Sequence, residues 1–220
     1  ESYTAATFSA HIAKEIQTYL LQTVPHKAEY IQASKNVLDI QVETTKQTKP
    51  GISKDEMRRI TYTKGAVSVI IYHQCLDEAA DAQMLEVLFL IGSLYQLGND
   101  IFDLYKDVRD NIYTLVNTCD NYVQFKKDFM ERIKLQNEKI HALPYAKKDK
   151  EDFCMVMNTI NARSLVAIDQ FISTQKKYGS KIDWWKLKRK EMIVDMEKPK
   201  NILKWLHYII QITPPAPKGE

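Results

Sequence analysis

Hydrophobic side chains recur every three to four residues along most of the chain. This spacing places them on one face of an α-helix, whereas a half-buried strand alternates every second residue. We therefore predict an all-α fold of seven or eight helices without a convincing strand. The predicted helices cover residues 3–23, 26–45, 53–75, 82–111, 120–141, 148–178, 182–190 and 201–212.

The segment 82–111 is a strongly apolar predicted helix that follows an acidic connection at residues 77–81. No proline occurs between Gly51 and Leu143, so we expect the segment to continue as one helix. Apolar residues occupy most of its circumference, which is typical of a helix that other helices bury on all sides. We therefore expect residues 82–111 near the centre of the fold.

The composition is typical of a globular protein, with 45% hydrophobic and 27% charged residues. Lys and Arg number 31 against 28 Asp and Glu, a balance that does not indicate a nucleic-acid-binding protein. The three cysteines lack a CxxC pair, which argues against a disulfide framework or zinc site and favours a reducing, cytoplasmic location. Since no apolar run reaches the ~18 residues of a transmembrane helix, we expect no membrane span, and a homodimer is compatible with these features.

Oxygen-bearing side chains line up near the end of the apolar helix. Asn99, Asp103 and Asp107 are spaced four residues apart, which on a continuous helix forms a stripe about 12 Å long. Asp and Asn without His or Cys are the ligands that suit Mg²⁺. A solvated polar face is the alternative, although acidic groups near a helix C-terminus oppose its dipole. The pattern favours a Mg²⁺ site at these three residues and the adjacent Asp100.

The same run resembles the second metal-binding motif of the class I isoprenoid synthases. That motif reads Phe-Gln-x-x-Asp-Asp-x-x-Asp in prenyl diphosphate synthases, Asn-Asp-x-x-Ser-x-x-x-Glu in terpene cyclases, and Gln-x-x-Asn-x-x-x-Asp-x-x-x-Asp in squalene and phytoene synthases. The positions that carry the resemblance are Tyr95, Gln96, Asn99, Asp100, Asp103 and Asp107. Asn99 stands where the first pattern has Asp, and Asp103 and Asp107 stand where the second has Ser and Glu.

Upstream, Lys64-Gly65-Ala66 resembles the Lys-Thr-Gly-Ala start of the helix that precedes this motif in prenyl diphosphate synthases. The two similarities cover residues 58–115, about a quarter of the chain. The resemblance implies a helical bundle of the isoprenoid synthase type, Mg²⁺ as cofactor and an allylic isoprenoid diphosphate as substrate. It also implies that Lys64 faces the diphosphate and that Tyr95 and Gln96 belong to the catalytic site.

One feature of that family is missing from the expected position. Its members carry a first aspartate-rich motif on the opposite wall of the site, far upstream of the second, and only 98 residues precede Asn99. Asp77, Glu78 and Asp81 have the right residue types, but they directly precede the same helix and cannot face it. We therefore expect residues 1–220 to be a single helical domain, the C-terminal portion of a longer catalytic domain that lacks its N-terminal helices here, with residues 213–220 as a disordered tail.

Two basic pairs, Arg58-Arg59 and Arg189-Lys190, are further candidates for diphosphate binding, because guanidinium and ammonium groups bind phosphate oxygens. Surface charges are the favoured alternative for both pairs.

The function expected from the resemblance is Mg²⁺-dependent ionisation of an allylic isoprenoid diphosphate, followed by coupling or cyclisation. A terpenoid synthase and a prenyltransferase both fit, so we expect an enzyme of one of these kinds. The alternative is a non-catalytic helical scaffold or ligand-binding relative that lacks the first aspartate-rich motif.

Overall fold

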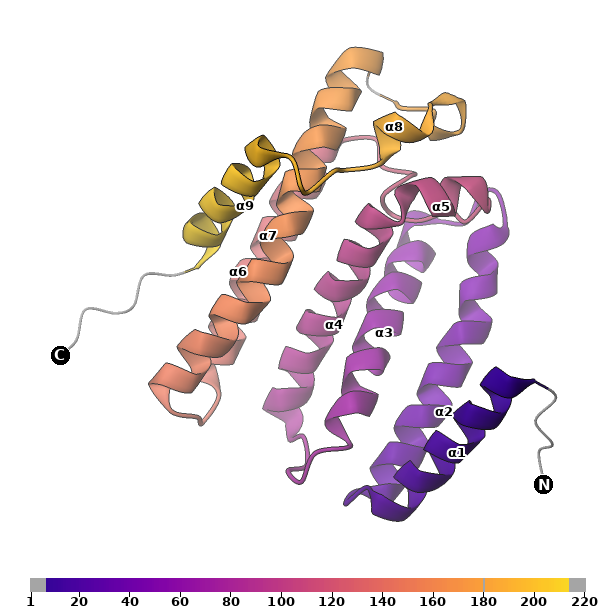
Figure 1. The fold of residues 1–220 in the computed structure, drawn as a ribbon, viewed down its shortest axis with the longest axis vertical. Coiled ribbons are helices and arrows are strands. Elements are labelled where there is room, and N and C mark those ends of the chain that lie inside the picture. Colours follow the sequence, from indigo (N-terminus) through magenta and orange to yellow (C-terminus); the bar gives the residue numbers. More distant parts are fainter. Residues whose placement is uncertain (1–6, 180, 214–220) are drawn as a thin grey trace.

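The computed structural model describes residues 7–179 and 181–213, and within them it is all-helical and has no strand (Figure 1). The prediction of an all-α fold is therefore confirmed. The elements are α1 (Phe8–Thr23), α2 (Lys27–Thr44), the 3₁₀ turn η1 (Thr45–Thr48), α3 (Lys54–His73), α4 (Ala82–Phe102), α5 (Leu104–Arg109), α6 (Tyr122–Ala142), α7 (Lys147–Tyr178), the 3₁₀ turn η2 (Trp184–Lys186), α8 (Arg189–Met192) and α9 (Pro199–Ile212). Residues 1–6 and 214–220, which include most of the expected tail, lie outside the described part.

The helices α3 and α4 form the closely packed hairpin on which the candidate site is built. Their first turns are held by side-chain caps, since Ser53 Oγ accepts a hydrogen bond from the Glu56 backbone N–H at 3.1 Å and Asp81 Oδ1 accepts one from the Met84 backbone N–H at 2.7 Å. Such caps satisfy backbone donors that a helix leaves unpaired at its start. Both helices therefore begin at positions that local chemistry explains.

The predicted helix 82–111 is divided in two, which corrects the expectation of one continuous helix. The helix α4 ends at Phe102, Asp103 has φ −86° and ψ 4°, and α5 then crosses the end of α4 (Figure 1). The bend keeps Leu104 and Val108 in the core that also buries Ile101. Continuing straight would carry these apolar side chains beyond that core, so burial favours the bend although no Gly or Pro marks it.

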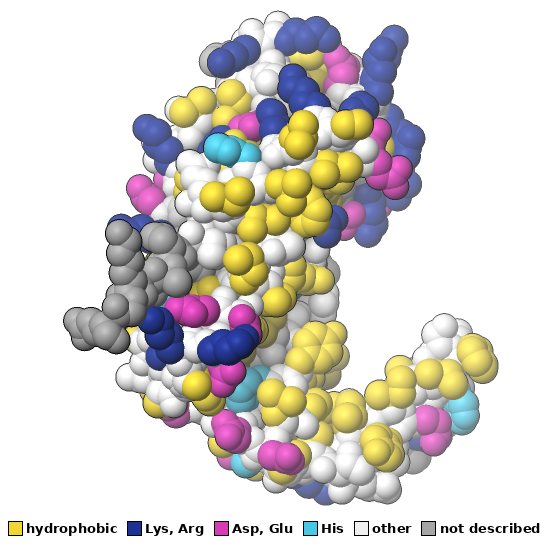
Figure 2. All heavy atoms as spheres, turned by 60° about the vertical axis from the view of Figure 1, so that its left-hand side comes forward, with side chains coloured by type: hydrophobic (Ala, Val, Ile, Leu, Met, Phe, Trp, Pro, Cys, Tyr) yellow, Lys and Arg dark blue, Asp and Glu magenta, His cyan; other side chains and the backbone are white. Residues whose placement is uncertain are grey.

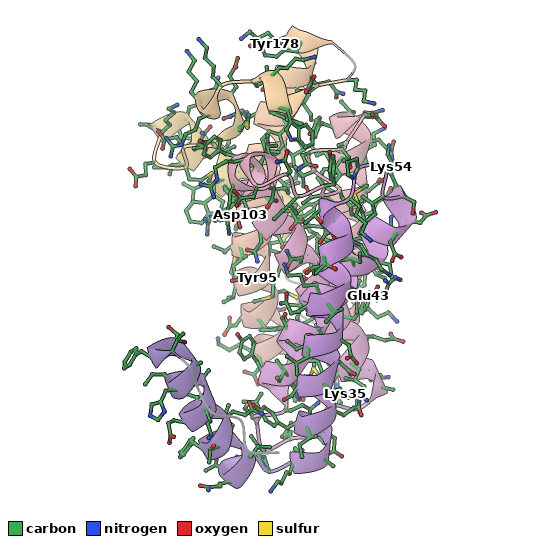
Figure 3. All side chains as sticks on the ribbon, turned by 90° about the vertical axis from the view of Figure 1, so that its right-hand side faces the viewer. Lys35, Glu43, Lys54, Tyr95, Asp103 and Tyr178 are labelled. Atoms are coloured by element: carbon green, nitrogen blue, oxygen red, sulfur yellow. The ribbon has the colours of Figure 1, made fainter. Side chains whose placement is uncertain are left out.

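The helix α4 is buried on most of its surface but not on all sides. It packs against α3, α6 and α7, and Leu94 and Ile101 are almost fully buried. Its other face carries Leu85, Phe89 and Tyr95, which are 39%, 41% and 53% exposed. Figure 3 shows why: α1 projects away from the other helices and leaves this side of the molecule open. Figure 2 shows hydrophobic side chains on both sides of the resulting hollow.

The C-terminal third packs around the long helix α7. The helix α9 lies along α7, and α6 lies against both α7 and α4. The predicted helix 182–190 is instead two short pieces, η2 and α8, because the chain is extended at Leu187 and Lys188. Trp184, the first residue of η2, is fully buried against Tyr122 and Phe171, and its packing holds this turn in the core ahead of the extended residues.

Candidate functional site

A polar cavity of about 320 Å³ lies where α4 bends into α5. Its walls come from the end of α2, from η1, from the middle of α3 and from both sides of the bend. The residues that line it are Thr44, Thr45, Gln47, Thr48, Lys64, Gln96, Asp100, Asp103, Lys106, Asp107, Ile112 and Thr114. The bend is therefore the feature that creates the cavity, because it brings side chains from two helices to one place.

Asp100 is the most deeply buried carboxylate of the cavity, with 6% of the residue exposed. Gln96 Nε2 donates a hydrogen bond to its Oδ1 at 2.7 Å, and Thr61 Oγ1 lies 3.5 Å from its Oδ2. Burial raises the pKa of Asp100 to about 6, although the Gln96 hydrogen bond and the charge of Lys64 oppose that rise. A carboxylate placed this way repels further negative charge and attracts a cation.

Asp107 is brought to the same cavity by α5 and is 8% exposed. Burial raises its pKa to about 7, and the negative charges of Asp100 and Asp103 add to the rise. Asp103 itself stands at the bend with 54% of its side chain exposed, and Lys106 Nζ lies 3.9 Å from its Oδ2. Three carboxylates thus share one cavity, two of them buried and one open to solvent.

Lys64 is the basic residue that α3 contributes to this cavity. Its positive charge lowers the pKa of both Asp100 and Asp107 against the effect of burial. One ammonium group does not balance three carboxylates, even with Lys106 near the mouth. The cavity therefore has a negative wall with a positive group beside it, an arrangement that suits a metal ion with an anion bound to it.

The part of the cavity lining that comes from the end of α2 and from η1 was missed by the sequence analysis. It consists of Thr44, Thr45, Gln47 and Thr48, and the Gln47 side chain is anchored by donating to the Tyr113 carbonyl oxygen at 3.1 Å. The threonine hydroxyls donate to backbone carbonyl oxygens three residues earlier, for example Thr48 to Thr45 at 2.8 Å, so each hydroxyl oxygen keeps lone pairs that can accept a hydrogen bond. The cluster of hydroxyl residues before Pro50-Gly51 was the signal that could have drawn attention to it.

The structure separates two residues of the expected motif, Asn99 and Tyr95, from the other motif residues. Asn99 is exposed and does not line the cavity, because Gln96 and Asp100 occupy the inward side of α4 at this level. Tyr95 is 53% exposed and points to the open side of the molecule, the side on which Asp103 also lies (Figure 3). The stripe of Asn99, Asp103 and Asp107 needs a straight helix, and the bend at Asp103 ends it.

The two basic pairs lie away from the carboxylates. Arg59 forms ion pairs with Glu43 and Glu56, and Arg58 pairs with Asp55 at 2.7 Å and lines a different cavity. In the second pair, the Arg189 guanidinium lies 5.4 Å from the centre of the Tyr105 ring. Lys190 is exposed on α8. These placements match the surface-charge alternative more closely than a diphosphate site.

The acidic residues before α4 lie at the opposite end of that helix from Asp103 (Figure 1). Asp81 caps α4, and Glu78 Oε2 accepts a hydrogen bond from the Tyr145 hydroxyl at 3.2 Å. Asp77 is exposed. None of these three residues lines the polar cavity, so their roles in the described structure are local.

The donor set of the cavity fits Mg²⁺ in chemistry, since it offers carboxylate and amide oxygens and neither His nor Cys. Within residues 7–179 and 181–213, no three His, Cys, Asp or Glu side chains converge closely enough to enclose a metal ion by themselves. Mg²⁺ usually keeps several waters and is held by one or two carboxylates together with substrate phosphates. The wide spacing therefore fits an ion that is shared with an anionic ligand better than a closed structural metal site.

Comparison with known proteins found no match for this chain among family models, curated proteins or solved structures. None of the helices in the described part of the chain combines the length and the hydropathy that crossing a membrane requires.

Proposed function

We propose that the polar cavity binds an allylic isoprenoid diphosphate together with Mg²⁺ and promotes loss of the diphosphate. The observation that carries the proposal is that Asp100, Asp103 and Asp107 share one cavity with Lys64. The resemblance of the run 95–107 to the isoprenoid synthase metal motif supports it, as does the all-helical architecture. In this proposal Asp100, Asp103 and Asp107 hold the metal, and the bundle is of the isoprenoid synthase type.

Each polar group has a defined task in this scheme. Bound Mg²⁺ would supply Lewis acidity and positive charge for the departing diphosphate. Lys64 neutralises part of the negative charge that develops on the leaving group. Gln96 holds the Asp100 carboxylate in one orientation through its 2.7 Å hydrogen bond. Preorganised groups of this kind need little rearrangement during the reaction.

The open face of α4 offers a place for the hydrocarbon part of the substrate. Phe89 and Tyr95 are 41% and 53% exposed on the helix that carries Asp100, and Tyr95 lies about two turns before Asp103 (Figure 3). An aromatic, apolar surface favours an isoprenoid chain and stabilises a carbocation through the ring faces. The product, whether of coupling or of cyclisation, depends on what encloses this face.

A non-catalytic ligand-binding role is the second candidate. The observation that favours it is that the described residues contribute one set of three carboxylates to the cavity, and no three of their His, Cys, Asp or Glu side chains converge closely enough to enclose a metal ion. Such a protein would bind the diphosphate with Mg²⁺ and release no pyrophosphate.

The test compares binding with turnover. Titration calorimetry with inorganic pyrophosphate, with and without Mg²⁺, measures binding at the cavity, and release of pyrophosphate from allylic diphosphates of several chain lengths measures turnover. We expect Mg²⁺-dependent binding that Asp103→Ala weakens at least about tenfold, because a metal ligand is lost. Asp110→Ala is the matched control, since Asp110 lies on the same segment and pairs with Arg109 at 2.7 Å outside the cavity.

The outcomes separate the candidates. Binding and release that both depend on Asp103 support the enzyme. Binding without release supports the ligand-binding relative. Two results would contradict both candidate functions. One is pyrophosphate binding that is equally strong without Mg²⁺, and the other is binding to Asp103→Ala that is as strong as binding to wild type. A triple Asp77→Ala, Glu78→Ala, Asp81→Ala variant should bind within about threefold of wild type, because these residues lie outside the cavity.

A further inference from the structure

The last described helix, α9, is apolar on two sides. Its inner side is anchored in the fold, since Tyr208 is buried and Trp205 Nε1 donates a hydrogen bond to the Thr159 carbonyl oxygen at 2.8 Å. Its outer side carries Leu203, Leu206 and Ile210, which are 69%, 48% and 77% exposed. Spacings of three and four residues put these three side chains in one stripe along the helix. The stripe is therefore a surface feature of a docked helix and not a fraying end.

Basic side chains flank this stripe. Lys200, Lys204 and His207 line a shallow depression beside Leu203, together with Asp169 and Tyr208. Asp169 does not make the depression negative, because both Lys126 and Lys204 pair with it at 2.7 and 3.0 Å. Figure 2 shows lysine and arginine side chains around the hydrophobic ones in the upper part of this face.

The charge of the whole C-terminal segment has the same sign. Residues 181–213 contain eight Lys or Arg and four Asp or Glu, a net charge of +4. The full chain carries +3, so the remaining residues together carry −1. Positive charge is thus concentrated in the part of the sequence that includes the exposed apolar stripe.

We infer that α9 is a membrane-surface helix that lies flat on an anionic bilayer. Leu203, Leu206 and Ile210 enter the boundary between headgroups and acyl chains, and Lys200, Lys204 and His207 contact the phosphate groups of anionic lipids. Helices with an apolar stripe and lysines on the flanks bind in this way, and the strength depends on both features. The inference stands on α9 and the positive charge around it, and it does not require the proposed diphosphate chemistry.

A second copy of the chain fits this surface less well. A two-fold dimer would place the same patch on both partners, so the lysines of α9, Lys200 and Lys204, would lie near those of the second copy and repel them. The stripe of α9 is also small, because a helix of 14 residues is about 21 Å long and a stable interface buries roughly 800 Å² on each partner. An anionic bilayer matches the charge and needs only a narrow apolar stripe.

Vesicle sedimentation tests the inference. The protein is mixed with vesicles of phosphatidylcholine alone and with vesicles in which phosphatidylglycerol replaces part of it. We expect binding only to the anionic vesicles, and a loss of at least about tenfold in the variant Leu203→Asn, Leu206→Asn, Ile210→Asn, because less apolar surface enters the bilayer. Lys200→Gln should weaken binding about fivefold.

The helix α2 supplies matched controls. Ile31, Leu38 and Val42 are 50%, 67% and 69% exposed, so their triple change to Asn removes a similar apolar surface from another exposed helix. Lys35→Gln removes an exposed lysine of that helix. Both variants should bind vesicles as wild type does, and circular dichroism checks that all variants are folded.

Three results would overturn the inference. The first is equal binding of wild type to neutral and anionic vesicles. The second is an α9 triple variant that binds anionic vesicles with wild-type affinity. The third is a loss of vesicle affinity in the α2 variants as large as the loss in the α9 variants. Sedimentation velocity gives a fourth. If wild type is a dimer that does not bind vesicles, and the α9 triple variant is a monomer, the stripe is an interface with a second copy of the chain.

Discussion

The backbones of Gly65 in α3 and Gly92 in α4 lie against each other. A Cβ atom added to Gly65 would stand 1.9 Å from the Gly92 carbonyl oxygen, and one added to Gly92 would stand 2.3 Å from the Gly65 carbonyl oxygen. Both obstacles are backbone atoms of a packed helix, so the two helices would have to separate. Gly92 thus leaves no open space beside α4, because α3 fills it. The close approach also brings Lys64, the neighbour of Gly65, to the same cavity as the Asp100 carboxylate on α4.

We expect Gly92→Ala to destabilise the fold by about 2 kcal/mol. The strain of overpacking is typically 1–3 kcal/mol or more, and it exceeds the roughly 1 kcal/mol that Ala gains over Gly within a helix. Pyrophosphate binding in the presence of Mg²⁺ should fall in the same variant, because α3 carries Lys64 away from Asp100. Urea unfolding and calorimetry measure the two effects.

Gly98→Ala is the matched control in the same helix. The nearest atom to its added Cβ is the Ser164 side-chain oxygen at 3.1 Å, which can move by the few tenths of an ångström required. The helix preference of Ala over Gly and the mild strain of this contact oppose each other, so the free energy of unfolding should change by less than about 1 kcal/mol. Equal unfolding midpoints for Gly92→Ala and wild type would show that the close helix contact is not needed for stability.

The shared cavity also predicts how stability depends on pH without metal. Burial and the nearby carboxylates raise the pKa of Asp107 to about 7 from its ordinary value of 3.8. Between these pH values the folded state holds a proton that the unfolded state has lost, so stability decreases as the pH rises. Asp107→Asn removes this effect and should stabilise the protein by about 2 kcal/mol at pH 8, a figure reduced for partial solvent contact, and by nothing near pH 4.

Unfolding in urea at several pH values, with a chelator present, measures this difference. The stability of Asp110→Asn relative to wild type should depend on pH in the opposite way, because the hydrogen bond with Arg109 lowers the pKa of the Asp110 carboxylate in wild type. Wild type should be more stable than Asp110→Asn at pH 7, and this difference should disappear as the pH falls through the pKa of the paired carboxylate. A difference between Asp107→Asn and wild type that did not change with pH would contradict the assigned environment of Asp107.

The sequence was sufficient for elements whose ends depend on local chemistry. The predicted helix 53–75 and the observed α3 agree because Pro50-Gly51 and the Ser53 cap act within a few residues. The bend at Asp103 could not be predicted in this way, because it depends on the burial of Leu104 and Val108 in a core assembled from distant segments. Tertiary packing decided against the continuous helix that periodicity indicated.

The candidate site shows the same division. The motif drew attention to the region around Asp103 and to Lys64, and the structure brings these residues to one cavity. Residue spacing could not distinguish Asn99 from Asp100 as the inward residue, because the two side chains lie about 100° apart on α4 and both belong to a matching pattern. The position of Thr44 to Thr48 beside the cavity depends on how α2 packs against α3, and a short sequence motif carries no information about that packing.

The cap of α4 provides a prediction that separates stability from ligand binding. Asp81→Ala should lower the free energy of unfolding by about 1 kcal/mol, because the Met84 N–H loses the side-chain acceptor to which it donates at 2.7 Å. Binding of pyrophosphate should not change at temperatures where the variant is folded. Asp77→Ala is the control, since the structure uses the Asp77 backbone oxygen, which accepts from His26, and that atom remains. A fall in stability as large in Asp77→Ala as in Asp81→Ala would argue against the capping role.

The polar cluster beneath α9 gives the last prediction. Asp169 on α7 accepts hydrogen bonds from Lys126 at 2.7 Å, from Lys204 at 3.0 Å and from the Tyr208 hydroxyl at 2.9 Å. Asp169→Asn preserves the shape but leaves two lysines without their carboxylate. Removing one partner of a largely buried ion pair is costly because the remaining charge stays desolvated. We expect the free energy of unfolding to fall by about 2 kcal/mol, less than for a fully buried pair, because Asp169 and Lys126 are 19% and 21% exposed and Lys204 is 40% exposed.

Two comparisons show whether charge is the cause of that loss. The double variant Asp169→Asn, Lys126→Met should recover part of the stability, because it removes one of the uncompensated charges. Asp152→Asn breaks an exposed pair with Lys148 on the same helix and should leave the urea midpoint unchanged, since exposed pairs contribute little. Hydrogen exchange should locate the effect of Asp169→Asn in α9, whose inner side depends on this cluster. Two results would mean that the packing of Trp205 and Tyr208 holds α9 without help from the ion pairs. One is hydrogen-exchange protection of α9 in Asp169→Asn that equals the protection in wild type. The other is a double variant that is less stable than Asp169→Asn.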